Sequence, residues 1–122
     1  MSQRDRDGRT PLHSAALSNS VDVAVAELAR GADPDDPDRL GFTPLHLAAQ
    51  EGSAAVTQIL LEGGATVDSV NAYGNTPLFV AVFNSRGRGD VIALLRAHGA
   101  NVRRPNKSGQ TPLGTSETNS QL

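Results

Sequence analysis

Two histidines at matching places in the sequence are the first candidates for chemistry, because imidazole nitrogens bind metal ions. His13 and His46 each lie two residues after a proline, in the strings TPLHSAA and TPLHLAA, and are 33 positions apart. A zinc site needs three or four ligands, yet no carboxylate or thiol recurs beside the two histidines. We therefore expect no metal and a structural role, in which each ring hydrogen-bonds the preceding Thr side chain or a backbone group of the first helical turn.

A run of acidic residues suggests a calcium site. Asp33, Asp35, Asp36 and Asp38 follow one another closely, and Ca²⁺ prefers oxygen ligands such as carboxylates. An EF-hand loop, however, needs a glycine at its sixth position and a glutamate at its twelfth. Counted from Asp33, these positions hold Asp38 and Pro44, so we interpret the run as a solvated acidic loop.

The stretch Arg86-Gly87-Arg88-Gly89 allows three interpretations. Its glycines would expose backbone N–H groups and its arginines would pair with anions, as in phosphate or RNA binding. No strand pattern precedes the stretch, however, and no run of stacking aromatic residues accompanies it. A flexible insertion between helices is favoured, a contact element for another protein comes second, and phosphate or nucleic-acid binding comes third.

The composition argues against several further classes of function. The chain of 122 residues has no cysteine, which excludes disulfides, thiolate metal sites and cysteine nucleophiles. Its serines and histidines form no nucleophile motif such as G-x-S-x-G, so we expect no enzyme and no cofactor. With 11 basic and 13 acidic residues, the chain lacks the charge of a dedicated nucleic-acid or anionic-membrane surface.

The distribution of charge and hydropathy bears on location and partners. The N-terminal segment MSQRDRDGRT is polar and no later run approaches membrane-spanning length, so we expect a cytoplasmic protein. Residues 1–61 are net acidic and residues 62–122 are net basic. Ordinary solvation explains this asymmetry; the alternative is a partner with the opposite gradient, which would steer association.

The candidate residues belong to a repeat that runs through almost the whole sequence. The dipeptide Thr-Pro begins at positions 10, 43, 76 and 111, with steps of 33, 33 and 35 residues. Gly-Ala begins at positions 31, 64 and 99, and a glycine stands two residues before every Thr-Pro. The two additional residues of the last step lie between Thr76 and Gly99, around residues 84–89.

Each repeat predicts a pair of helices. Thr is a good N-cap and Pro suits the first helical position, so Thr-Pro begins a helix. The small residues of the following Leu-x-x-Ala-Ala let a neighbouring helix come close. After a polar break, a second apolar segment ends at the glycine of Gly-Ala, which suits the left-handed C′ position, and an Asp-, Asn- and Pro-rich turn follows. The expected second helices are 21–28, 56–61 and 90–95.

The pattern Gly-x-Thr-Pro-Leu-His-x-Ala-Ala, followed by Val and Leu positions and Gly-Ala-Asp, resembles the ankyrin repeat. The resemblance covers residues 5 to about 115 and implies an all-α solenoid of stacked helix-turn-helix units with projecting β-hairpin-like loops. Phe79 and Gly114 stand where the first two units have His. The expected organisation is one domain over residues 1–116, with repeats at about 5–37, 38–70 and 71–105, a partial fourth at 106–116, and a disordered tail at 117–122.

Proteins that resemble this chain act as protein-interaction modules, and the resemblance implies no reaction. We expect a monomer that binds another protein and, from its charge, neither nucleic acid nor membrane. The main interpretation is an adaptor or scaffold. The alternatives are a bacterial immunity or inhibitor protein that neutralises a toxin or an enzyme by occlusion, and a structural or engineered scaffold without a natural partner.

The resemblance also implies where a partner binds, namely at residues flanking the loop glycine and at those after the Ala-Ala pair. Leu40, Phe42, Tyr73 and Phe83 are large apolar side chains at such positions, where a binding hot spot would lie, although local covering of the stack is the alternative. The expected binding residues, with two arginines of the insertion, are Arg39, Leu40, Phe42, Gln50, Glu51, Tyr73, Asn75, Phe83, Asn84, Arg86 and Arg88. The fourth unit adds Lys107, Ser108 and Gln110.

Overall fold

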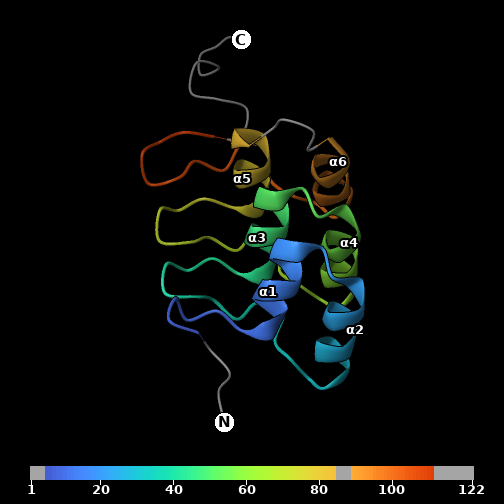
Figure 1. Cartoon of the computed structure of the whole chain (residues 1–122). Helices are drawn as coiled ribbons and strands as arrows, with labels where there is room; N and C mark the ends of the chain where they lie inside the picture. The colour runs from blue at the N-terminus through green and yellow to red at the C-terminus, as the bar shows by residue number, and fades with distance from the viewer. Residues whose placement is uncertain (1–4, 85–88, 112–122) are drawn as a thin grey trace.

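Three helix pairs make up the part of the chain that the computed structural model describes, which is residues 5–84 and 89–111. The first helices of the pairs stack on one another in one layer, and the second helices form another layer beside it, to the right in Figure 1. This arrangement is the all-α repeat solenoid that the sequence predicts. The helices are α1 (Pro11–Ser18), α2 (Val21–Ala29), α3 (Pro44–Glu51), α4 (Ala54–Glu62), α5 (Pro77–Phe83) and α6 (Gly89–Ala97).

The Thr-Pro dipeptides begin the first helix of each pair, as predicted. Thr10, Thr43 and Thr76 are the N-caps, and each side-chain oxygen accepts a hydrogen bond from the backbone N–H three residues later. In α1 and α3 the residue at that third position is a histidine, whose ring accepts the N–H of the cap residue and completes a capping box. In α5 the third position is Phe79, so only the Thr half of the box is present.

Glycine ends the second helix of each pair, and the end of α4 shows why. Gly64 has φ +94°, a left-handed conformation that a residue with a Cβ adopts only with strain. Its N–H donates to the carbonyl of Leu61, and the N–H of Ala65 donates to Leu60, which is the pairing of a Schellman motif. The start of α4 differs from the prediction, because Ser53 is the N-cap and the helix begins at Ala54 rather than at Val56.

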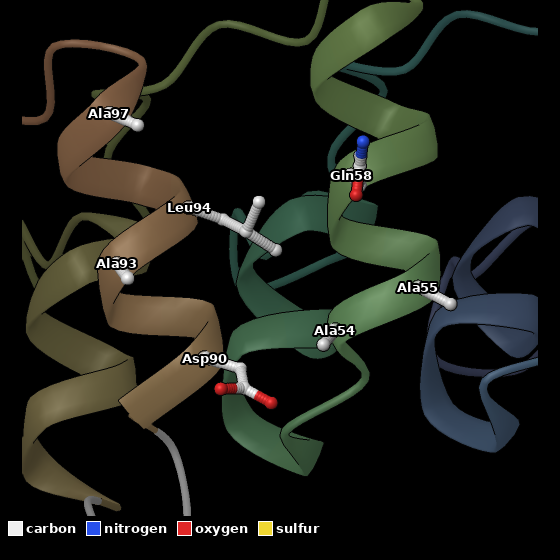
Figure 2. Close-up of a pocket in the computed structure, with 7 residues that line it drawn as sticks. All are labelled: Ala54, Ala55, Gln58, Asp90, Ala93, Leu94 and Ala97. Atoms are coloured by element: carbon white, nitrogen blue, oxygen red, sulfur yellow. The ribbon is translucent and has the colours of Figure 1, made fainter.

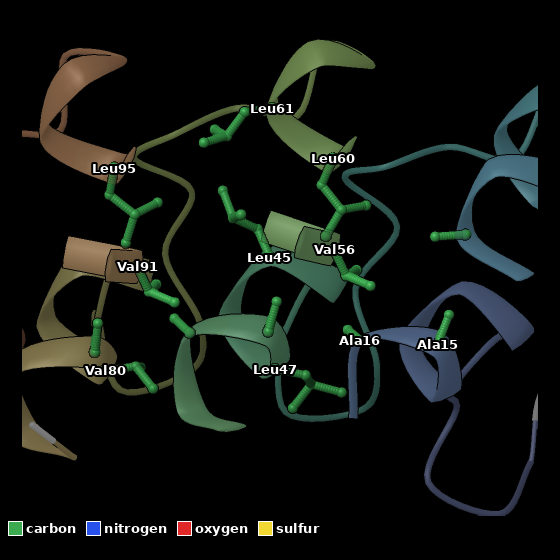
Figure 3. Packing of buried hydrophobic residues seen from close by; sticks show 14 of the residues in the cluster. Ala15, Ala16, Leu45, Leu47, Val56, Leu60, Leu61, Val80, Val91 and Leu95 are labelled. Carbon is green, nitrogen blue, oxygen red and sulfur yellow. The ribbon is translucent and has the colours of Figure 1, made fainter. Parts of the chain in front are cut away.

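The core lies between the two helix layers and is built from aliphatic side chains and alanines. Leu12, Leu45 and Leu78 occupy the same place in successive repeats and are fully buried. The adjacent alanines of α1 and α3 are also buried, so neighbouring first helices pack closely. Figure 3 shows Val56, Leu60, Val91 and Leu95 of the second helices pointing toward the first helices.

Tight hairpin-like loops project from the layer of first helices. In the loop from Asp38 to Phe42 the N–H of Asp38 donates to the carbonyl of Phe42 at 2.9 Å, and the N–H of Gly41 donates back to Asp38 at 3.0 Å. Successive loops are joined by one backbone hydrogen bond each, from Ala72 to Leu40 at 2.7 Å in the central pair. The loops therefore form a row of fingers along one side of the solenoid (Figure 1), with no strand assigned in the described part of the chain.

A candidate protein-interaction groove

The two candidate metal-binding histidines join neighbouring repeats. The ring of His13 accepts the N–H of Thr10 at its Nδ1 (3.0 Å), and its Nε2–H donates to the carbonyl of Phe42 (2.8 Å). His46 repeats the arrangement, with the N–H of Thr43 at 3.1 Å and the carbonyl of Asn75 at 2.7 Å. The sequence predicted the contact with Thr and missed the bond to the next repeat. Both rings are buried with both nitrogens hydrogen-bonded, an arrangement that fixes the backbone of the following loop.

Burial sets the protonation state of these histidines. Desolvation lowers the pKa of His46 to about 4 and also lowers the pKa of His13. Protonating Nδ1 would turn an acceptor into a donor that faces another donor, the N–H of the cap residue. The neutral Nε2–H form therefore predominates near neutral pH. Within residues 5–84 and 89–111, no three His, Asp or Glu side chains come together as metal ligands.

Side chains of neighbouring loops make a second polar contact, whose residue types differ from one pair of loops to the next; we call each such contact between two successive loops a joint. At the first joint, Arg9 Nε donates to Asp38 Oδ2 at 3.4 Å. At the last joint, Asn106 Nδ2 donates to Asn75 Oδ1 at 2.7 Å. At the central joint the matching residues are Phe42 and Asn71. Phe42 offers no polar group there, and Asn71 Nδ2 is buried without a partner.

A groove lies in the angle between the loops and the first helices, and extends from the loop at Phe42 to the loop at residues 106–110. One wall comes from three successive loops and the other from α5 and the end of α3. The residues that line it are Phe42, Gln50, Tyr73, Asn75, Phe79, Val80, Phe83, Asn84, Asn106, Ser108 and Gln110.

Four aromatic rings dominate this groove. Phe79 and Phe83 of α5 are stacked, with ring centroids 6.2 Å apart and an interplanar angle of 12°. Phe42 and Tyr73 meet edge to face, with centroids 6.5 Å apart. Phe83 is 79% exposed and Tyr73 is 52% exposed, which is unusual for side chains of this size. Of the two, Phe83 is the more exposed.

The groove brings together eight of the expected binding residues: Phe42, Gln50, Tyr73, Asn75, Phe83, Asn84, Ser108 and Gln110. Four expected residues do not line it and are exposed to solvent: Arg39, Leu40, Glu51 and Lys107. The N–H of Arg39 donates to the carbonyl of Asp7 in the first loop at 3.0 Å. Arg86 and Arg88 lie outside the described residues, as does the tail 117–122.

Sequence reasoning missed Phe79, Val80 and Asn106 as groove residues. A signal for Phe79 was present, since it replaces the histidine of the first two repeats. His13 and His46 are fully buried because hydrogen bonds hold their rings between two repeats. A phenyl ring makes no such bonds, and Phe79 is only half-buried and stacks on Phe83 in the groove.

A second hollow lies on the opposite side of the solenoid, between α4 and α6. Figure 2 shows Leu94 of α6 and Gln58 of α4 facing the gap between these helices. The rest of its lining is mainly alanine, and it has no aromatic residue and few polar groups. The loop-side groove is therefore the better candidate site.

Comparison with known families agrees with this architecture. Residues 24–106 match the family described as ankyrin repeats in three copies, and residues 7–39 match the single ankyrin repeat. The chain belongs to the ankyrin-repeat family, whose members are in general protein–protein interaction modules and not enzymes. No curated protein matches the chain. None of the helices in the described ranges is both long and apolar enough to cross a bilayer.

Proposed function

We propose that this chain is a non-enzymatic adaptor that binds another protein in the groove between its loops and α5. The observation that carries this proposal is the pair of exposed aromatic side chains, Tyr73 and Phe83, that face one groove from two different elements. Exposed apolar patches of this kind mark interaction sites, and aromatic residues supply much of the binding energy at interfaces. The protein acts as a cytoplasmic monomer in this proposal.

The alternative of an inhibitor or immunity protein would use the same groove to occlude a toxin or an enzyme. In a more specific version of this alternative, the acidic first half of the chain would imitate phosphate charge and so mask a basic nuclease. This version has less support. Asp35 uses its carboxylate between repeats, where Oδ1 accepts the N–H of Thr66 at 2.7 Å and Oδ2 accepts its hydroxyl at 2.6 Å. The groove itself has no acidic lining residue among those described.

Affinity capture from native cell lysate tests the proposal with a matched pair of variants. Tyr73→Ser combined with Phe83→Ser removes the two exposed rings, whereas Val25→Ser removes an exposed apolar side chain (51% exposed) from α2, outside the groove. We expect the wild type and Val25→Ser to retain the same partner and the double variant to lose it. Equal capture by all three proteins, each with a normal circular dichroism spectrum, would contradict the proposed site.

A further inference from the structure

We infer that the groove takes an uncharged, extended segment of its partner, which inserts a large apolar side chain between the aromatic pairs and hydrogen-bonds its main chain to the surrounding amides. This inference rests on the proposed function and names the class of partner for the same groove.

The absence of charge in the lining is the first argument. None of the described groove residues is ionised at neutral pH, since all are aromatic, aliphatic, amide or hydroxyl side chains. Arg9 and Asp38 of the first two loops pair with each other, and the exposed Lys107 of the last described loop does not line the groove. An ionised side chain of the partner would lose hydration in the groove and find no counter-charge among these residues, which is unfavourable. The segment that enters is therefore neutral.

The aromatic rings supply the anchor for an apolar side chain. One pair, Phe42 with Tyr73, comes from the loops, and the other, Phe79 with Phe83, comes from α5. Each pair is already in a favourable edge-to-face or stacked arrangement, so little side-chain freedom is lost when a partner binds. An aromatic, leucine or proline side chain placed against the exposed faces of Tyr73 and Phe83 would bury apolar area on both walls.

The amides supply contacts for a main chain. A neutral amide group both donates and accepts hydrogen bonds, which suits peptide N–H and carbonyl groups better than ions. Asn106 Nδ2 donates to Asn75 Oδ1 at 2.7 Å and to Gln110 Oε1 at 3.3 Å. These bonds orient both amides and leave the NH₂ groups of Asn75 and Gln110 to donate to the carbonyls of a segment lying along the loops.

The missing side-chain hydrogen bond between Phe42 and Asn71 at the central joint provides an independent argument. A polar residue at this place would satisfy Asn71, as Asn75 satisfies Asn106 at the next joint. Phe42 instead leaves the buried Asn71 Nδ2 without a partner. Violations of a local rule are typical of functional positions. The aromatic ring at position 42 therefore serves the groove rather than the joint.

Selection from a library of random peptides tests this inference with the full chain as bait. We expect enriched peptides to carry a large apolar residue and fewer Asp, Glu, Lys and Arg than the starting library. Their affinity, measured by fluorescence polarisation, should change less than about twofold between low and molar salt, because no ion pair is formed. Phe42→Asn and Phe83→Ser should each weaken binding by about tenfold or more, the effect of losing a hot spot, while Val25→Ser binds as the wild type.

Two results would overturn the inference: enrichment of charged peptides whose affinity falls with salt, or no groove-dependent peptide at all. If lysate capture still depends on Tyr73 and Phe83 in that case, the proposed function stands and only the class of partner is wrong. If lysate capture does not depend on these residues, both proposals fall.

Discussion

The imidazole of His46 donates its Nε2–H to the backbone carbonyl of Asn75 in the next repeat, at 2.7 Å. Its other nitrogen accepts the N–H of Thr43 in its own repeat. One neutral ring therefore fixes a helix start and the following loop at once. His13 makes the same connection between the first and second repeats, to the carbonyl of Phe42.

The stability of the fold should therefore depend on pH in the mildly acidic range. An unfolded histidine binds a proton below pH 6.5, whereas burial keeps His46 neutral down to about pH 4. The unfolded state thus binds more protons in this window, and the free energy of unfolding falls as the pH drops from 6.5 to 4. The lowered pKa of His13 acts in the same direction.

Urea unfolding at a series of pH values measures this dependence. We expect a loss on the order of 3 kcal/mol from His46 across the window. The control is His46→Phe, which copies the residue that the third repeat carries at Phe79. This variant should be less stable at neutral pH and show a shallower pH dependence. A wild-type free energy of unfolding that stays constant from pH 6.5 to 4 would contradict the histidine arrangement.

A buried hydroxyl makes a second connection between repeats. Ser53 Oγ donates to the carbonyl of Ala16, near the end of α1, at 2.7 Å, and Ser53 is buried. Ser53→Ala should lower the free energy of unfolding by about 1–2 kcal/mol, because it leaves a buried carbonyl without a donor. Ser20 is the matched control in the first repeat, since its hydroxyl pairs only with Ser18 on the exposed side. Chemical denaturation should show a loss below about 0.5 kcal/mol for Ser20→Ala, as at other surface positions.

The sequence could predict those features that depend on neighbouring residues. The caps at Thr10 and Thr43, the left-handed glycine at Gly64 and the bond from each histidine to its Thr all lie within a few residues, so residue type alone indicates them. The bond from His46 to Asn75 spans two repeats and uses a backbone carbonyl, which leaves no mark in the sequence. No residue type reveals such a partner.

The candidate groove was only partly predictable for the same reason. Residues flanking the loop glycine, such as Phe42, Tyr73 and Asn75, follow from their position in the repeat. Whether a loop residue faces the groove also depends on the adjoining loop. Arg39 satisfies the positional rule, yet its backbone bonds to the first loop and it lies outside the groove.

Two glycines with similar backbone angles should respond differently to substitution. Gly41 has φ +82° and Gly64 has φ +94°, so alanine is strained at both, by about 1–2 kcal/mol. A Cβ at Gly64 meets no atom within 4 Å, whereas a Cβ at Gly41 would lie 2.9 Å from the Cα of Asn71 in the next loop. Gly41→Ala must therefore also push two loops apart and weaken the bond between Ala72 and Leu40.

Thermal and urea unfolding of the two alanine variants separates the backbone strain, which both share, from the clash with the next loop, which only Gly41→Ala causes. We expect Gly41→Ala to lose at least about 1 kcal/mol more than Gly64→Ala, the net value of one hydrogen bond between loops. Equal losses would mean that the loops are not in close contact at Gly41.

Replacement of Phe42 tests whether its aromatic ring lowers the stability of the fold by leaving the buried amide of Asn71 without a partner. Phe42→Asn would provide an acceptor for the buried Asn71 Nδ2, as Asn75 does for Asn106 at 2.7 Å. Phe42→Ala removes the same ring, including its edge-to-face contact with His46 at 5.6 Å, but leaves Asn71 without a partner. Both variants lose the half-buried phenyl group, so their difference isolates the amide. We expect Phe42→Asn to be more stable than Phe42→Ala by about 1 kcal/mol in urea unfolding, because one buried donor becomes satisfied. If the two variants are equally stable, or Phe42→Ala is the more stable, then Asn71 is satisfied in the native protein and Phe42 carries no such cost.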